Sequence, residues 1–311
     1  MSHSSMESIL SWENLIYLTD LIQISGEYHV SLLGGEPTLH PEFVNYVIYL
    51  LERKIAVTVF TSGIISSQTF EEMTSAFQHI PDGRLSFVCN LNDPALSRPE
   101  EFERIGPFLD EFGSRTVSGF NIYRPDFSLD FLFEYILRYG MVRQIRLGLA
   151  HPLPGAKNVF VAIEDIAAVM ERLVSYGPLF ERFRMVPSLD CGFPLCALSN
   201  EQLGMLYRIV GGPIRFGCSP AIDIGPDMSV WSCFPLWTYH RKSVFDFNSI
   251  REIVMFYHEK LRGLRIEAGG IYEACDECKY REEDKCFGGC VAHLLSRFRN
   301  EERTRVEEIY Q

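Results

Sequence analysis

Short apolar segments recur along the first half of the chain about every 28 residues, and each is followed by a stretch with helical periodicity. Strands that are covered on both faces are largely apolar throughout. On this basis we predict five strands, at residues 28–33, 56–61, 85–89, 117–122 and 144–149. Right-handed crossovers would make such a parallel sheet curl. The pattern therefore predicts an α/β fold, a partial parallel (βα) barrel.

Helices are expected between these strands and after the last one. Their predicted ranges are 41–54, 67–79, 100–112, 129–139 and 163–176. A further helix is predicted to start at Trp12, with Ser11 as its cap. No strand precedes that helix, so the series lacks its first strand and one edge of the sheet would be open. We expect a segment upstream of Met1 to supply the missing strand.

The sequence pattern of the chain changes after Ala150. Residues 151–155 contain two prolines and a glycine, which break regular structure, and from Asp190 onward the elements become shorter and cysteines frequent. We predict two domains. Residues 1–188 would form the partial barrel, and residues 189–311 would form a small, cysteine-rich α+β domain.

The composition excludes several classes of protein. Of the 311 residues, 47% are hydrophobic, which is enough to fill cores and argues against disorder. The formal net charge of −12 repels phosphate backbones and anionic membrane surfaces, so neither nucleic acid nor membrane is expected as a partner. The chain has no apolar run near the ~18 residues of a membrane span and does not open with a signal peptide. We predict a cytoplasmic protein.

Nine cysteines in a cytosolic chain indicate metal ligation, because a reducing compartment does not maintain a disulfide framework. Cys89 lies in an apolar run and is predicted to be a core residue. The other eight all follow residue 190. They are Cys191, Cys196, Cys218, Cys233, Cys275, Cys278, Cys286 and Cys290.

The spacing of the late cysteines predicts soft-metal sites. Four thiols lie close together between Cys275 and Cys290, and Cys218 and Cys233 flank a predicted hairpin at 225–227. Eight thiolates divide into two sites of four, which favours iron–sulfur clusters. A single four-cysteine zinc site is the alternative.

A second motif, Gly34-Gly35-Glu36-Pro37, follows the first predicted strand. The two glycines allow a tight turn that exposes backbone groups, and the Glu36 carboxylate can accept a hydrogen bond from an ammonium group. Parallel-sheet proteins bind ligands at this end of their strands. The alternative is an ordinary strand-to-helix turn with a solvated glutamate.

Together, this loop, the βα series and the cysteine array resemble the radical S-adenosylmethionine enzymes that carry a SPASM or twitch extension. The resemblance extends from about residue 11 to residue 295. It implies that Gly34, Gly35, Glu36 and Pro37 hold the amino group of S-adenosylmethionine.

The resemblance also suggests other cofactor contacts. Ser62 lies in a Thr-Ser-Gly sequence that is similar to the family's Thr-Asn-Gly, close to the cofactor. Asn90, Asn92 and Arg146 occupy positions at which the family often contacts the ribose or the carboxylate. The alternative is that these side chains cap strands or pair locally.

The family pattern divides the cysteines between two auxiliary 4Fe-4S clusters. It implies that Cys218, Cys233 and Cys290 hold one cluster, with Cys191 or Cys196 as the fourth ligand. The remaining late cysteines would hold the other. The family has a further ligand, a cysteine downstream of this array, but no cysteine follows Cys290 here. The second cluster is therefore either incomplete or completed by whichever of Cys191 and Cys196 the first cluster does not use. His293 is a reserve ligand, or more simply a surface or capping residue.

The chain contains no CxxxCxxC sequence, the motif with which radical S-adenosylmethionine enzymes bind their catalytic cluster. We attribute this to the same missing upstream segment, and we expect residues 1–311 by themselves not to cleave S-adenosylmethionine.

Three hypotheses follow. The first is a radical S-adenosylmethionine oxidoreductase or maturase that acts on a peptide or small protein substrate and takes electrons from a donor. The second is a degenerate, non-catalytic iron–sulfur module for peptide binding or electron relay, and the third is a zinc-stapled structural domain. The sequence identifies no catalytic residue. Tyr123, Arg124 and His151 near strand ends are candidates, but a structural role is the simpler interpretation for each.

Overall fold

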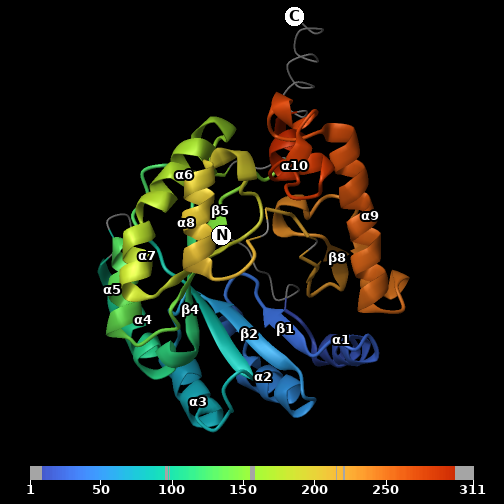
Figure 1. Cartoon of the computed structure of the whole chain (residues 1–311). Helices are drawn as coiled ribbons and strands as arrows, with labels where there is room; N and C mark the ends of the chain where they lie inside the picture. Colours follow the sequence, from blue (N-terminus) through green and yellow to red (C-terminus); the bar gives the residue numbers. More distant parts are fainter. Residues whose placement is uncertain are drawn as a thin grey trace, which may run out of the picture. The chain divides into compact units, whose positions relative to one another are not determined.

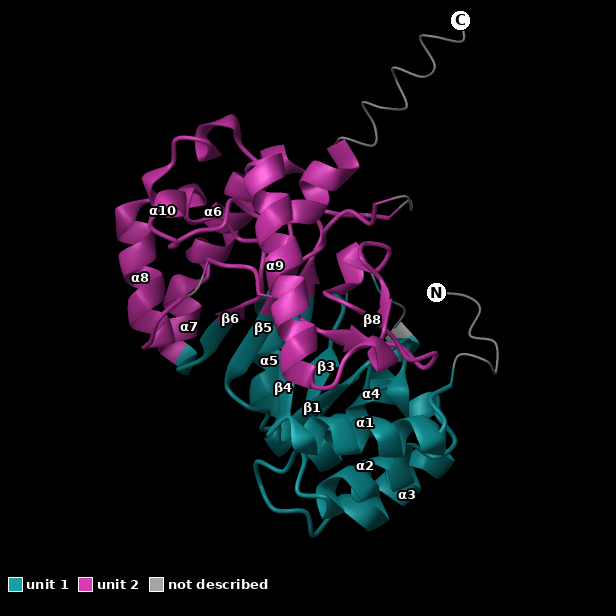
Figure 2. Ribbon diagram, turned by 90° about the vertical axis from the view of Figure 1, so that its right-hand side faces the viewer, with its two compact units in different colours: residues 1–120, 128–146, 183–187 teal, residues 121–127, 147–182, 188–311 magenta. Residues whose placement is uncertain are grey.

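The computed structural model describes residues 9–94, 97, 99–154, 158–214, 216–219 and 221–297. The chain divides into two compact units, coloured separately in Figure 2. The first unit contains residues 1–120, 128–146 and 183–187, and the second contains residues 121–127, 147–182 and 188–311. The division into domains 1–188 and 189–311 stays a prediction.

The largest sheet has six strands in sequential order. They are β1 (His29–Leu32), β2 (Ala56–Thr61), β3 (Leu85–Asn90), β4 (Thr116–Ile122), β5 (Gln144–Leu149) and β6 (Val186–Leu189). The predicted α/β fold and its five strands are confirmed, whereas β6 was not predicted. Among the described strands, β1 and β6 are the two edges of this sheet, which therefore does not close into a barrel. The pairs His29↔Ala56 and Val57↔Leu85 fix a parallel register for β1, β2 and β3.

Helices α2 to α5 of the first unit fall between the strands, as predicted, and α1 precedes β1. Figure 1 shows α2, α3 and α4 along one face of the strands. Their bounds are α1 (Trp12–Ile24), α2 (Phe43–Glu52), α3 (Ser67–Phe77), α4 (Pro99–Phe112) and α5 (Asp130–Arg138). The Ser11 cap is confirmed, because its side chain accepts a hydrogen bond from the backbone N–H of Asn14 at 3.2 Å. Helix α2 is shorter than predicted because Lys54 has a positive φ of 64°, which ends the helix.

Alternate residues of β2 build the core of the first unit. Val57 and Val59 are buried, as the period-two pattern of a strand dictates. On β3, Phe87 is fully buried and its ring centroid lies 5.3 Å from that of Phe108 on α4. Cys89 is also fully buried, so its predicted core role is confirmed, and burial raises the pKa of its thiol.

The elements from residue 166 onward are shorter, apart from one long helix. They are α6 (Ile166–Ser175), α7 (Gly177–Phe183), α8 (Asn200–Val210), β7 (Asp223–Ile224), β8 (Ser229–Trp231), β9 (Lys242–Ser243), α9 (Ile250–Ala268) and α10 (Lys279–Glu282). Strands β7, β8 and β9 form a small antiparallel sheet. The predicted hairpin is confirmed, with the Met228 N–H donating to the Gly225 carbonyl at 2.9 Å.

Single turns of 3₁₀-helix connect many of these elements. They are η2 (Pro37–Leu39), η3 (Gly113–Arg115), η4 (Ile163–Asp165), η5 (Leu195–Ala197), η6 (Phe234–Leu236), η7 (Val244–Asp246) and η8 (Glu273–Cys275). None of the helices within the described ranges is both long and apolar enough to cross a membrane.

Truncating Phe87 tests whether this side chain stabilises the core of the first unit. We expect Phe87→Ala to lower the free energy of unfolding by about 3–5 kcal/mol, because it removes a fully buried ring and leaves a cavity. The control Ile24→Ala, at a side chain that is 78% exposed, should stay within about 0.5 kcal/mol of the wild type. Urea denaturation measures both, and equal effects would contradict this description of the core.

Candidate cofactor and cluster sites

The Gly34–Pro37 loop lies beside the end of the neighbouring strand. It follows β1, and the register pairs Leu32 near the end of β1 with Val59 near the end of β2. Because the two strands are parallel, the loop after β1 and the residues after β2 meet at the same edge of the sheet. Residues Gly34–Pro37 and Ser62, both predicted as cofactor contacts, are thus brought together.

The Glu36 carboxylate joins these two segments. Its Oε1 accepts hydrogen bonds from the hydroxyls of Thr38 and Thr61, each at 2.8 Å. Its Oε2 accepts from the backbone N–H of Ser62 at 2.7 Å and from the Ser62 hydroxyl at 2.8 Å. Both oxygens are therefore engaged within the protein. The carboxylate fixes the shape of the loop, and the backbone of the loop is the part left to face a ligand.

Sequence reasoning missed the two threonines that hold Glu36. The signal was present, because Thr38 stands two residues after Glu36 and Thr61 ends the next predicted strand. Short hydroxyl side chains at such places commonly bond to neighbouring polar groups. What the sequence could not show is that both hydroxyls point at one carboxylate.

The space beside the loop is open. A Cβ atom built on Gly34 or Gly35 would meet no atom of the described protein within 4 Å, and Gly34 has a φ of +156°, which favours glycine. Neither glycine is thus required to avoid a clash with the chain itself. The bare backbone fits a role in which a ligand approaches closely, which is how the loop would take the amino group of S-adenosylmethionine.

The other predicted cofactor contacts lie on or just after strands β3 and β5 of the same unit. Asn92 is exposed beyond β3. Asn90 ends β3, and its buried Oδ1 finds no hydrogen-bond donor among the described residues. The Arg146 guanidinium on β5 lies 5.0 Å from the ring centroid of Phe60 on β2, a cation–π contact. Their contact with a cofactor stays a prediction.

The eight late cysteines all belong to the second unit, where they separate into two sets of four. Group A consists of Cys191, Cys218, Cys233 and Cys290, whose thiols act on one another electrostatically. Group B consists of Cys196, Cys275, Cys278 and Cys286, which line one small pocket. The sequence left open whether Cys191 or Cys196 is the fourth member beside Cys218, Cys233 and Cys290. The structure favours Cys191, because Cys191 lies with group A and Cys196 with group B.

Electrostatics distinguish the members of group A. The hydrogen bond from Cys191, together with the positive charge of Arg265, lowers the pKa of the Cys218 thiol to about 6 despite its burial. The same hydrogen bond and burial raise the pKa of Cys191. Burial raises the pKa of Cys233 to about 11, and it also raises the pKa of Cys290. Group A thus combines the buried Cys218 and Cys290 with the half-buried Cys233 and the exposed Cys191, and one thiolate is favoured among the four.

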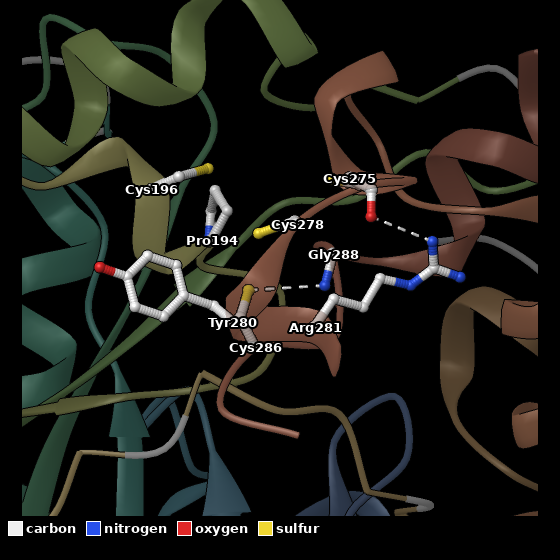
Figure 3. Close-up of a pocket in the computed structure, with 8 residues that line it drawn as sticks. All are labelled: Pro194, Cys196, Cys275, Cys278, Tyr280, Arg281, Cys286 and Gly288. Atoms are coloured by element: carbon white, nitrogen blue, oxygen red, sulfur yellow. Dashed lines mark hydrogen bonds between the residues drawn. The ribbon is translucent and has the colours of Figure 1, made fainter. Parts of the chain in front are cut away.

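Group B surrounds its pocket from three short segments. Figure 3 shows the sulfur atoms of Cys196, Cys278 and Cys286 directed toward the space between them. The backbone N–H of Gly288 donates to the Cys286 sulfur at 3.5 Å, an interaction typical of a thiolate or a metal-bound sulfur. Burial raises the pKa of Cys275 and of Cys196.

The donor set fits iron–sulfur clusters. Each group offers four soft thiols and no competing hard ligand within the set, which matches the four-thiolate ligation of a 4Fe-4S cluster. Within the described ranges, no three or more His, Cys, Asp or Glu side chains are already placed to hold a single metal ion. The assignment of clusters to the two groups stays a proposal.

His293 is not the surface or capping residue that we expected. It is only 5% exposed, and its Nε2 lies 3.5 Å from the Nδ1 of His151. Burial lowers the pKa of each imidazole to about 4, so both are neutral at pH 7. Of the other candidates near strand ends, Arg124 forms an ion pair with Asp126 at 3.2 Å.

Comparisons with known proteins connect this fold to a class. No protein-family model matches the chain, and no curated protein sequence matches it. Among solved structures, SuiB of Streptococcus suis bound to S-adenosylmethionine superimposes on 90% of this chain and 67% of its own, with a TM-score of 0.63 and 16% identity. SuiB bound to its precursor peptide SuiA gives a TM-score of 0.62 and 18% identity, over 90% of this chain and 64% of that one.

A further solved structure is anSMEcpe with bound AdoMet, which superimposes on 91% of this chain and 80% of its own with a TM-score of 0.60 and 16% identity. The chain spans about two thirds of the length of SuiB. At this identity the likeness concerns the fold. The chain has the fold of the radical S-adenosylmethionine enzymes, as the resemblance in sequence predicted.

Replacing Glu36 tests its structural role. We expect Glu36→Gln to lower the free energy of unfolding by about 1–2 kcal/mol, because an amide NH₂ would replace one oxygen and confront a hydroxyl or N–H donor. The matched control is Glu27→Gln at an exposed position of the same unit, which should have little effect. If both variants unfold like the wild type in urea, Glu36 does not hold the loop.

Proposed function

We propose that this chain provides the S-adenosylmethionine-binding loop and two auxiliary iron–sulfur sites of a radical S-adenosylmethionine enzyme that modifies a peptide. The observation that carries the proposal is the separation of the eight late cysteines into two groups of four. The open backbone of the Gly34–Pro37 loop, at the edge where parallel sheets bind ligands, supports the cofactor part.

In this proposal each part of the chain has a defined task. The backbone of Gly34 and Gly35 binds the amino group of S-adenosylmethionine, and Glu36 orients that backbone through Thr61 and Ser62. Groups A and B hold one 4Fe-4S cluster each. When bound, S-adenosylmethionine supplies, on reductive cleavage, a radical that abstracts hydrogen from the substrate. The catalytic cluster would require a CxxxCxxC sequence, which these 311 residues do not contain.

A peptide or small protein is the proposed substrate. SuiB with its precursor peptide SuiA, and anSMEcpe with the Kp18Cys peptide, both superimpose on about nine tenths of this chain. An electron donor is the second proposed partner, because the clusters must be reduced. All nine cysteines are free thiols, which supports a reducing, cytoplasmic location. The alternative of a non-catalytic module gains no support from these comparisons.

Metal content tests the cluster assignment. After anaerobic reconstitution we expect about eight iron and eight sulfide ions per wild-type chain. We expect half of each in the double variants Cys191→Ala/Cys233→Ala and Cys196→Ala/Cys278→Ala, because each double variant removes two ligands from one group. Cys89→Ala, which alters only a core thiol, should keep the full content. Bound zinc in a colourless protein, or a wild type with too little iron for one cluster, would contradict the assignment.

Binding of S-adenosylmethionine tests the loop. We expect Gly35→Val to weaken binding at least tenfold in isothermal titration calorimetry, since the new side chain occupies the open space beside the backbone. Its stability should change little, because a Cβ atom at this position meets no protein atom within 4 Å. Gly212→Val, at another uncrowded glycine, is the matched control. Unchanged affinity in Gly35→Val, or loss of affinity in both variants, would contradict this placement of the cofactor.

A further inference from the structure

Arg265 on helix α9 lies against group A. Its Nη2 donates to the backbone carbonyl of Cys218 at 2.6 Å. Its guanidinium carbon lies 4.5 Å from the ring centroid of Phe287, in a cation–π contact. The side chain is therefore held by a carbonyl and an aromatic ring, both of which orient the cation without neutralising it.

The positive charge of Arg265 has no carboxylate partner. Across the described ranges, no Asp or Glu oxygen lies within 4.0 Å of its nitrogens, and its buried Nε finds no hydrogen-bond acceptor. Burying an unpaired guanidinium is costly, and proteins normally offset that cost with a counter-charge. The orphaned donor on this partly buried cation thus indicates a nearby anion other than an Asp or Glu carboxylate.

Group A is the anionic centre within reach. The Arg265 guanidinium is bonded to the backbone of Cys218, one of the four members of this group. The Asp223 carboxyl, which acts on Cys233, contributes no positive charge, and burial raises its pKa to about 6.

Group B has an arginine in a similar place, but that arginine is paired. Arg281 donates to the carbonyl of Cys275 at 3.3 Å and forms an ion pair with Asp276 at 3.4 Å. It also donates to the backbone carbonyl of Arg265 at 2.6 Å. The two arginines therefore differ electrostatically, since among the described residues Arg281 has a carboxylate partner and Arg265 has none.

We propose that Arg265 is a positioning residue that raises the reduction potential of the cluster in group A above that of the cluster in group B. This inference rests on the proposed function, because it requires that both groups hold clusters. Uptake of one electron adds one negative charge to a cluster, and a nearby unpaired cation stabilises that reduced state. Electrons from the donor would then collect in group A.

The test is a dithionite titration of the reconstituted full chain, followed by electron paramagnetic resonance. The signals are assigned with Cys196→Ala/Cys278→Ala, which keeps only group A, and Cys191→Ala/Cys233→Ala, which keeps only group B. In the wild type we expect group A to be reduced first. In Arg265→Gln we expect the ratio of reduced to oxidised group A, at a fixed potential, to fall at least tenfold, or about 59 mV for a one-electron couple. Group B should shift little.

Two further variants separate charge from packing. Arg265→Lys keeps the charge and should retain most of the wild-type potential, and Arg262→Gln, at an exposed position of the same helix, should change neither group. If Arg265→Gln fails to retain the iron of group A, Arg265→Lys must retain it at nearly the wild-type potential.

Three results would overturn the inference: equal shifts of both groups in Arg265→Gln, no shift of either group, or the same loss in the Lys and Gln variants. A wild type without iron would instead overturn the proposed function, so the two failures are distinguishable.

Discussion

The gathering of eight thiols in the second unit, four of them buried, is the constraint on which that unit depends. Burial favours the neutral thiol, as the raised pKa values of Cys233 and Cys290 show, whereas metal ligation requires thiolates. Strands β7 and β9 are two residues long and bury little by themselves. Metal binding and folding should therefore be one coupled equilibrium in this unit, in which the metal offsets the cost of deprotonation.

The first unit depends on no such group. Its parallel strands carry buried residues such as Val59 and Phe87 against the helices that follow them. The loop after β1 is fixed by an internal carboxylate, Glu36, whose partners Thr61 and Ser62 end the next strand. In the proposed function, the loop is therefore already shaped before S-adenosylmethionine binds, which would lower the entropy cost of binding.

Strands β1 to β5 could be predicted because each is an apolar run at a regular interval. Strand β6 could not, since Val186–Leu189 is short and contains Pro187. The cysteine spacing predicted two sites but could not choose between Cys191 and Cys196, which are five residues apart in sequence. Cys191 follows β6 closely and Cys196 lies in η5. The folded path of the backbone between them carries the two cysteines to different groups, and the sequence does not show that path. The burial of His293 depends equally on a distant partner, His151, that periodicity does not show.

The most direct test of the central claim is an anomalous diffraction map, recorded at the iron absorption edge, from crystals of the anaerobically reconstituted chain. The account predicts two separate iron clusters, one ligated by Cys191, Cys218, Cys233 and Cys290 and the other by Cys196, Cys275, Cys278 and Cys286. A single mononuclear metal site, or a cluster whose ligands come from both groups, would contradict it.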